Sequence, residues 1–394
     1  MRVTLTDPAA LIPGFARAYA EQRAGERAAR EPAWQPSHTV YVPADAFGPE
    51  TAARWAATAS ALLAAYLRSP GALAGVFEVD SPALAAEVHR RVVAKLSGGR
   101  TVEDLRIDFE DGYGERAPDE EDAHAEAAAR SVAEMHAAGT LPRRWGLRVK
   151  SFADGDPGRA VRTLDGFLTT LTTLAGGLPR GFRVTFPKVV MEEYLGQFAT
   201  CLSALEEGLG LPPGALPLEM QVEDPRTLPF LRPGLVETAR GRLAAAHFGV
   251  FDYTAACGLA PHEQRLDHPA CDHARHAMLA AFAGTSVELA DGSLAAAPAS
   301  ESASDVRALW RRHAEVVRHS LAHGYYQGWD MHPAHLVSRF VTTYAFHLEH
   351  RDRYASRVAA FVERRATGDG ALDEPATVRT LTAALARAGH ALGD

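Results

Sequence analysis

Two carboxylic acids stand near the ends of two segments that have the composition of buried strands. Glu223 lies in LPLEMQVED (216–224), and Asp252 lies in AAAHFGVFDY (244–253). Polar and apolar residues alternate in the first segment, which places Glu223 on its polar face. Mg²⁺ is usually held by one or two carboxylates while water and substrate oxygens complete its octahedron, so these acids are candidate ligands for Mg²⁺, or for Mn²⁺ in its place. The alternative is that they cap helices or pair with arginines.

Further charged residues lie in three other strand-like segments. Asp108 and Glu110 share one face of LRIDFEDG (105–112), and Arg148 and Lys188 place cations near the ends of two more segments. The planar fork of arginine suits bidentate recognition of a carboxylate. These four residues are therefore candidates for substrate binding. The alternative is that the two cations neutralise the acids beside them.

The elements that must position these side chains are strands that alternate with helices. Eight segments are strand candidates: 38–45, 105–112, 146–152, 182–189, 216–224, 244–253, 285–294 and 324–333. Such alternation is typical of βα units and a parallel sheet. Eight units within this length predict an α/β fold, a (β/α)8 TIM barrel of about 250 residues plus insertions, with its active site at the carboxyl ends of the strands.

The chain extends beyond this barrel at both ends. Residues 1–37 are expected to form an N-terminal helical extension, because 15–31 is charged and rich in alanine. Residues 38–333 are expected to form the TIM-barrel catalytic domain. The last segment, 334–394, is expected to be a helical appendage or lid.

Composition and charge exclude several classes of protein. The net charge of −8 provides no basic surface for nucleic acid. No apolar run approaches the roughly 20 residues that cross a bilayer, and the N-terminus lacks the layout of a signal peptide, so a cytoplasmic protein is expected. Three cysteines are too few for a disulfide framework.

Six motifs in order resemble one family. DFED, LRVK, FPKV, QVED, FGVFDY and GWDMHP resemble motifs of the citrate lyase β-subunit-like proteins. That family belongs to a wider group, the HpcH/HpaI aldolases and malate-synthase-like barrels of the phosphoenolpyruvate/pyruvate-binding superfamily. The resemblance covers roughly residues 38–378. The chain looks like a separate branch rather than a true citrate lyase subunit, because the intervening segments and the first 35 residues differ.

The resemblance implies roles for the charged residues. Glu223 and Asp252 would be the Mg²⁺ ligands, and Arg148 would bind the carboxylate of a 2-oxo acid. The cluster of Asp108 and Glu110 would line the water shell of the metal. A lid aspartate that the family places over the active site, often that of a neighbouring protomer, corresponds to Asp373 in GALDEPATVRTL. This residue is also suited to cap the final helix.

The function that follows is a metal-dependent carbon–carbon lyase or aldolase, or the reverse condensation. Its substrate would be a small 2-oxo acid such as pyruvate, oxaloacetate or glyoxylate, alone or with an acyl-CoA. Arg148 and Asp373 would be catalytic, and the protein would be a homo-oligomer, a trimer or a multiple of one. The alternative is a non-catalytic relative that binds a metabolite or a protein. It is favoured by the absence of the family's lysine shortly before the motif at 328–333 and disfavoured by the presence of Glu223, Asp252 and Arg148. Lys150 replaces an asparagine of the family, and this change and the missing lysine both count against an acyl partner.

The segment CGLAPHEQRLDHPACDHARH (257–276) is rich in potential zinc ligands. Its cysteines and histidines are Cys257, His262, His268, Cys271, His273 and His276. Their spacing matches no complete four-ligand zinc pattern. A histidine-rich surface helix and loop is therefore the preferred interpretation.

Overall fold

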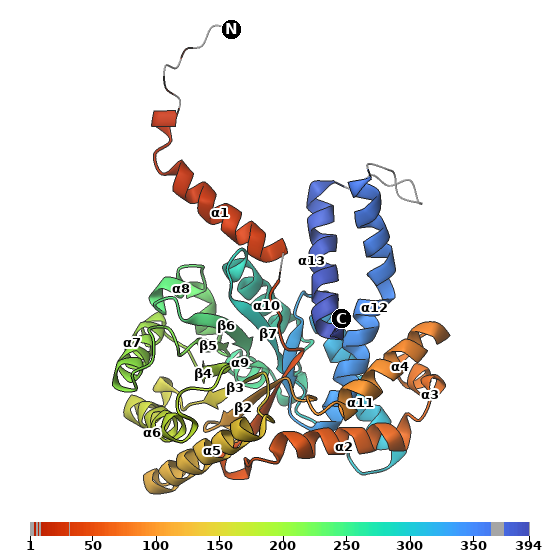
Figure 1. Ribbon diagram of the computed structural model, residues 1–394, viewed down its shortest axis with the longest axis horizontal. Helices are drawn as coiled ribbons and strands as arrows, with labels where there is room; N and C mark the ends of the chain where they lie inside the picture. The colour runs from red at the N-terminus through yellow and green to blue at the C-terminus, as the bar shows by residue number, and fades with distance from the viewer. Residues whose placement is uncertain (1–3, 5–6, 8, 31, 364–373, 394) are drawn as a thin grey trace.

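In the computed structural model, eight parallel strands close into a barrel in chain order (Figure 1). The strands are β1 (His38–Pro43), β2 (Asp104–Asp108), β3 (Arg144–Arg148), β4 (Phe182–Phe186), β5 (Leu218–Val222), β6 (Leu243–Phe248), β7 (Glu288–Ser293) and β8 (Gln327–Asp330). Each overlaps a segment that the sequence predicts as a strand, although β2, β3 and β6 begin one or two residues earlier than predicted, so the TIM barrel is confirmed. The structure describes residues 4, 7, 9–30, 32–363 and 374–393.

Helices cover the outside of the barrel. The α-helices are α1 (Phe15–Arg30), α2 (Thr51–Tyr66), α3 (Pro70–Phe77), α4 (Pro82–Ser97), α5 (Pro118–Ala138), α6 (Pro157–Ala175), α7 (Glu192–Gly208), α8 (Leu235–Thr238), α9 (Val250–Ala256), α10 (Pro269–Phe282), α11 (Ala303–Ala322), α12 (Pro333–Val362) and α13 (Pro375–Leu392). Short 3₁₀ turns lie at Ala9–Leu11, Ala44–Ala46, Phe152–Asp154, Pro225–Phe230 and Pro261–Glu263.

Local sequence signals start several of these helices. Ser81 caps α4, with its hydroxyl accepting from the Leu84 amide at 3.3 Å, and Pro82 is the first helical residue. This arrangement satisfies an amide that the helix itself cannot use, and the fixed φ of proline suits the first position. The same pairing at Ser69 and Pro70 begins α3.

The interior of the barrel contains buried ion pairs in place of a purely apolar core. Arg106 of β2 lies 2.6 Å from Glu219 of β5, across the barrel, and it also contacts Asp104. Thr185 of β4 donates to the same Glu219 carboxylate at 3.0 Å. Because all of these side chains are fully buried, the network fixes the relative positions of the strands, and removing one partner would leave a charge uncompensated.

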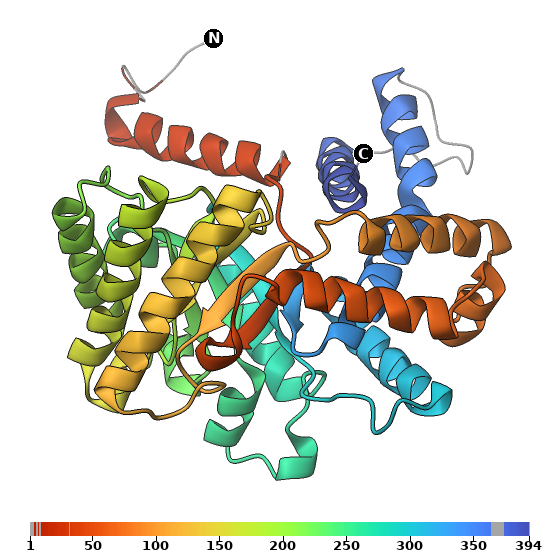
Figure 2. The ribbon, with the colours of Figure 1, turned by 60° about the horizontal axis from the view of Figure 1, so that its bottom comes forward.

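The segment after α1 covers the end of the barrel where the strands begin. The Trp34 ring lies 3.8 Å from the guanidinium of Arg143, which precedes β3. Gln35 donates to the Leu289 carbonyl at 2.9 Å and to Gln327 at 3.0 Å. Figure 2 shows α1 on one side of the barrel and the segment that follows β6 on the opposite side. The carboxyl ends of the strands therefore lie at the end of the barrel that α1 and the segment after it leave uncovered.

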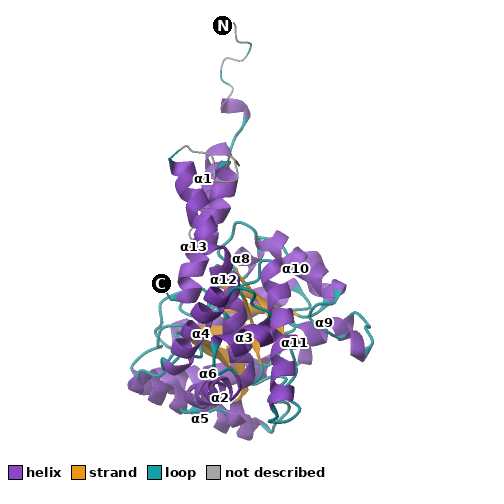
Figure 3. Cartoon of the chain, turned by 90° about the vertical axis from the view of Figure 1, so that its right-hand side faces the viewer, coloured by secondary structure: helices purple, strands orange, loops and turns teal. Residues whose placement is uncertain are grey.

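The C-terminal helices lie on the same side as α1. The first half of α12, directly after β8, is buried against α2, α4 and α11, so it acts as the eighth helix of the barrel. The rest of α12 and the antiparallel α13 project away from the barrel beside α1 (Figures 1 and 3). The Leu392 carbonyl near the end of α13 accepts from Arg91 of α4 at 3.0 Å. Asp373, the predicted lid aspartate, lies outside the described residues.

No helix in the described part of the chain is both long and apolar enough to cross a membrane.

Candidate active site

Arg148, the last residue of β3, is held by an acid of the neighbouring strand. Its Nε and Nη2 atoms donate to the two carboxylate oxygens of Asp108 at 2.7 and 2.6 Å. Its Nη1 atom lies 3.1 Å from Glu110. The register pairs Asp108 with Arg148 across β2 and β3, so the sheet itself brings the two side chains together. The prediction that Arg148 and the acids share the rim is consistent with this geometry, and so is the alternative that the arginine neutralises them.

Lys188 is a second cation that contacts the acids after β2. Two residues beyond β4, its Nζ atom contacts Glu110 and lies 2.7 Å from Asp111. The backbone of Lys188 has a φ of 48°, which is unusual for a residue with a side chain. In this conformation the Lys188 amide donates to Glu223 at 2.5 Å. The lysine therefore links the acids after β2 to the carboxylate after β5.

Glu223 directly follows β5 and is enclosed by its neighbours. It is 3% exposed. A Cβ atom on Gly249 would lie 2.5 Å from Glu223 Oε2, so only glycine leaves room for the carboxylate there. The alternation in 216–224 indicated this orientation, because Glu219, Gln221 and Glu223 share the polar face.

The prediction that Asp252 closes a strand is wrong. The strand β6 ends at Phe248, and Asp252 lies in the first turn of the short helix α9. The chain leaves the sheet at Gly249, which lacks the side chain that would collide with Glu223. Asp252 nevertheless lies close enough for its negative charge to raise the pKa of Glu223.

The acids at the rim repel one another. Burial raises the pKa of Glu223 to about 8, and the charges of Glu110 and Asp252 add to this effect. Burial and the charge of Asp111 likewise raise the pKa of Glu110 to about 7, although Arg148 and Lys188 oppose the shift. Burial and Asp111 also raise the pKa of Asp252. Carboxylates that are packed so closely that they resist ionisation have the arrangement expected of a cation site, because a divalent ion bound between them would relieve their repulsion.

The donor set fits a hard cation such as Mg²⁺. Glu223 and Asp252 offer only oxygen ligands, and Glu223 uses one oxygen for the Lys188 amide, which leaves Oε2 for another partner. Two groups of side chains in the described residues have three donor atoms close enough for a metal, and both lie elsewhere: Asp272 with His319 and His323, and His313 with Asp330 and His335. A cation on Glu223 and Asp252 would therefore need water or substrate oxygens to complete its shell.

Aromatic residues that the sequence did not single out form one wall of the site. The rings of Tyr41 and Trp329 lie 4.3 Å apart, and the guanidinium of Arg148 lies 5.0 Å from the first and 5.8 Å from the second. Gln221, also buried, has no hydrogen-bond partner for either atom of its amide. The shared polar face of Gln221 and Glu223 was the available signal for the glutamine, whereas nothing local marked the aromatic pair.

The fold and the rim define the class of protein as a TIM barrel with a charged site at the carboxyl ends of its strands. Residues 16–392 match the model of a family described as "Domain of unknown function (DUF6986)", and the chain belongs to that family. No curated protein matches the sequence.

Solved structures of malate synthase from Haloferax volcanii have a similar fold. The native enzyme at 3 mM glyoxylate has a TM-score of 0.53 and 16% identity, over 89% of this chain and 87% of the other. The magnesium/glyoxylate complex gives a TM-score of 0.52 and 16% identity, over 89% and 97%. The pyruvate/acetyl-CoA ternary complex gives a TM-score of 0.53 and 16% identity, over 89% of each chain. At this identity the likeness establishes the fold. Membership of the malate-synthase-like barrels and of their citrate lyase β-subunit-like branch stays a prediction.

Proposed function

We propose that the protein is a divalent-cation-dependent enzyme that forms or breaks a carbon–carbon bond next to the carbonyl group of a small 2-oxo acid. The observation that carries this proposal is that Arg148 at the end of β3, Glu223 directly after β5 and Asp252 in α9 lie close enough for their charges to act on one another. An arginine beside a pair of cation-binding acids suits a substrate with adjacent carboxylate and carbonyl oxygens.

Glu223 and Asp252 would hold the cation, which we take to be Mg²⁺ or Mn²⁺. Bound there, the ion would act as a Lewis acid for the oxygens of the oxo acid. Glu223 is kept in place by the Lys188 amide and by the close approach of Gly249. Such support from neighbouring residues orients a ligand before the cation arrives.

Arg148 would bind the substrate carboxylate and stabilise the negative charge that develops on the substrate. Asp108 fixes the plane of its guanidinium with two hydrogen bonds, so little reorganisation would be needed during the reaction. Its Nη1 atom lies 3.1 Å from Glu110, a longer contact than the two with Asp108. Nη1 is therefore the guanidinium nitrogen that a substrate could share with Glu110. Lys188 would keep Glu110 and Asp111 in place while the substrate binds.

The direction of the reaction and the second substrate are inferred from the similar structures. One of them is a complex of malate synthase with magnesium and glyoxylate, and another is a ternary complex with pyruvate and acetyl-CoA. We therefore favour condensation of a 2-oxo acid with an acyl-CoA over the lyase direction.

Asp373 is our proposed proton-transfer residue. The helices on either side of it, α12 and α13, project on the side of the barrel where the strands begin, away from the Glu223 rim of the same chain (Figures 1 and 3). We propose that Asp373 serves a neighbouring protomer, which requires a homo-oligomer.

The alternative is a non-catalytic barrel that binds a metabolite or a protein. It is favoured by one observation, because acids already contact all three guanidinium nitrogens of Arg148. A rise in the melting temperature on titration with Mg²⁺ plus glyoxylate or pyruvate would show that the site binds an oxo acid, since a ligand of the native state must raise it. Turnover then separates catalysis from binding alone.

The decisive experiment is turnover of an oxo acid with acetyl-CoA in Mg²⁺. Substitutions E223A and D252A should abolish it, whereas E193Q, at an exposed acid of α7, should leave it unchanged. Full turnover by E223A would overturn the metal assignment. Absence of any turnover and of any Mg²⁺-dependent thermal shift in the wild type would favour the non-catalytic alternative.

A further inference from the structure

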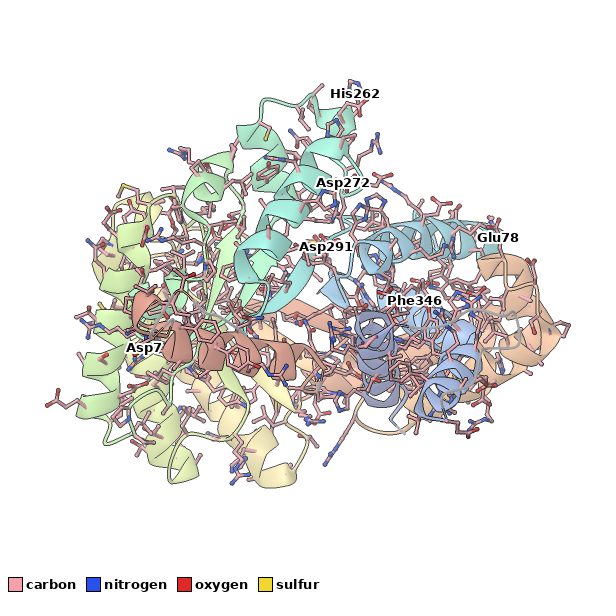
Figure 4. All side chains as sticks on the ribbon, turned by 90° about the horizontal axis from the view of Figure 1, so that it is seen from above. Asp7, Glu78, His262, Asp272, Asp291 and Phe346 are labelled. Atoms are coloured by element: carbon pink, nitrogen blue, oxygen red, sulfur yellow. The ribbon has the colours of Figure 1, made fainter. Side chains whose placement is uncertain are left out.

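Four potential metal ligands meet on the outside of the barrel, between α10 and α11. Asp272 and His276 are one helical turn apart on α10, and His319 and His323 are one turn apart at the end of α11. Residues four apart lie on the same face of a helix, so each helix presents two ligands to the other. We call these four residues the histidine cluster. Figure 4 labels Asp272 on α10, outside Asp291 of the barrel strand β7.

The donor atoms already lie close together. Asp272 Oδ1 is 2.8 Å from His319 Nε2 and 3.6 Å from His323 Nε2. The ligand atoms of these three residues all lie within 4.8 Å of one another. The exposed ring of His276 is 5.4 Å from that of His323. A tetrahedral ion with bonds of about 2.1 Å requires donor atoms about 3.4 Å apart, so small side-chain rotations would complete the geometry.

The hydrogen bond of His323 determines which nitrogen can bind a metal. His323 Nδ1 lies 2.9 Å from the His319 carbonyl, which can only accept, so Nδ1 carries the proton. In neutral His323 the lone pair is therefore on Nε2, which lies 3.6 Å from Asp272 Oδ1. A metal ion bound by both acceptors would remove the repulsion between them. A carbonyl that orients a histidine in this way is the usual second contact of a metal-binding imidazole.

We propose that the histidine cluster binds one transition-metal ion of the Zn²⁺ class. Imidazole nitrogens with one carboxylate suit Zn²⁺, Ni²⁺ or Cu²⁺, whereas Mg²⁺ prefers oxygen ligands. Asp272, His319 and His323 supply three ligands, and His276 or water supplies the fourth. The last carbonyl groups of α11 add a favourable negative field for a cation at its end.

Arg275 is a cation that contacts the cluster. Its Nη1 atom lies 2.6 Å from Asp272 Oδ1, but its Nε atom is paired with Asp291 at 2.9 Å and its Nη2 atom donates to the Leu266 carbonyl at 2.6 Å. Asp291 thus compensates much of its charge, and the contact of Arg275 with Asp272 is to Oδ1 alone among the contacts of the described residues. The bound ion would connect α10 to α11, which are successive helices of the barrel and are separated in sequence by β7 and its loop.

The test measures zinc bound per chain by equilibrium dialysis in excess Mg²⁺. The wild type should hold one more zinc ion than the double variant H319Q/H323Q, in which glutamine keeps a hydrogen-bonding side chain near Asp272. The control H262Q removes an exposed histidine outside the cluster and should bind as the wild type does. At a zinc concentration 100 times the Kd, the wild-type Tm should rise by about 3 °C and that of the double variant should not.

Equal zinc content in the wild type and H319Q/H323Q would overturn the proposal. If the double variant does not fold, D272N together with the absorption of bound Co²⁺ decides instead, because tetrahedral nitrogen and oxygen ligation gives characteristic visible bands that the wild type alone should show. Neither result depends on the proposed function, since the cluster lies outside the barrel. Oxo-acid turnover in Mg²⁺ is expected to be the same in the wild type and H319Q/H323Q.

Discussion

Asp108 holds Arg148 by two hydrogen bonds, from Nε at 2.7 Å and from Nη2 at 2.6 Å, across adjacent strands at the rim of the barrel. Both side chains are buried, at 2% and 5% exposure. A buried guanidinium with a carboxylate on one edge keeps a fixed orientation, and the edge near Glu110 determines what else can bind. Asp108 therefore fixes the orientation of the Arg148 guanidinium, which carries the positive charge of the proposed site.

The first prediction concerns R148K. Lysine keeps the positive charge but cannot make the two parallel hydrogen bonds to Asp108. We expect kcat/KM for the oxo acid to fall by about 10²–10³, with a far-ultraviolet circular dichroism spectrum like that of the wild type. The matched control is R162K, at an exposed arginine of α6 that pairs with Asp122 at 2.6 Å. Equal losses in both variants would refute the proposed role of Arg148.

The second prediction concerns Glu223 and pH in the absence of a divalent cation. The folded protein keeps a proton on Glu223 up to a pKa of about 8, whereas the unfolded chain loses it near the ordinary value of 4.5. The folded state therefore binds more protons between these values, and the free energy of unfolding should fall as pH rises through that window. In E223Q this fall should be smaller, so that the variant is roughly 2–4 kcal/mol more stable than the wild type at pH 8.

Mg²⁺ should reverse that order. A cation on Glu223 and Asp252 favours the ionised acids, so it should raise the wild-type Tm at pH 8 and leave the Tm of E223Q unchanged. Denaturant unfolding at several pH values, with Mg²⁺ and with a chelator, measures both effects. An equal response of the two proteins to Mg²⁺ would exclude Glu223 as a ligand.

The third prediction concerns the glycine that makes room for Glu223. In G249A the new Cβ would lie 2.5 Å from Glu223 Oε2 and 2.6 Å from its Cβ, so the carboxylate must move. We expect Mg²⁺ affinity to fall at least about tenfold, with a loss of stability of about 1–3 kcal/mol. The control G166A adds a methyl group to helix α6 where no atom lies within 4 Å, and it should be neutral or slightly stabilising. Calorimetric titration with Mg²⁺ compares the two variants.

The sequence predicted the barrel because its strands carry their own signals. The alternation in 216–224 placed Glu223 correctly, since side chains on a strand have only two faces. The same reasoning failed for Asp252, because Gly249 ends the strand and the following residues form a helix. That change depends on the space beside Glu223, which is a tertiary contact and leaves no local pattern.

Contacts between distant segments were likewise beyond the sequence. Tyr41 and Trp329 are neighbours only because β8 pairs with β1 and closes the barrel. The histidine-rich segment 257–276 lacked a full set of zinc ligands, and the missing ones, His319 and His323, come from the next helix. The spacing of residues along the chain predicts a site only when a single helix, strand or loop supplies all of its ligands.

The last prediction concerns acid stability at the α12–α13 packing. Burial lowers the pKa of His347 to about 4, and the charge of Arg387 on α13 contributes. The ring lies 6.0 Å from that of Tyr326, over which Arg387 also sits at 4.7 Å. Between pH 6.5 and 4, His347 is protonated in the unfolded chain but not in the folded protein. Its contribution to the free energy of unfolding is therefore complete above this window and is lost as pH falls through it. The loss attributable to His347 should be roughly 3 kcal/mol at most, and H347Q should remove it while H262Q should not. A parallel decline of the unfolding free energy in H347Q and the wild type between pH 7 and 4 would show that another group causes it.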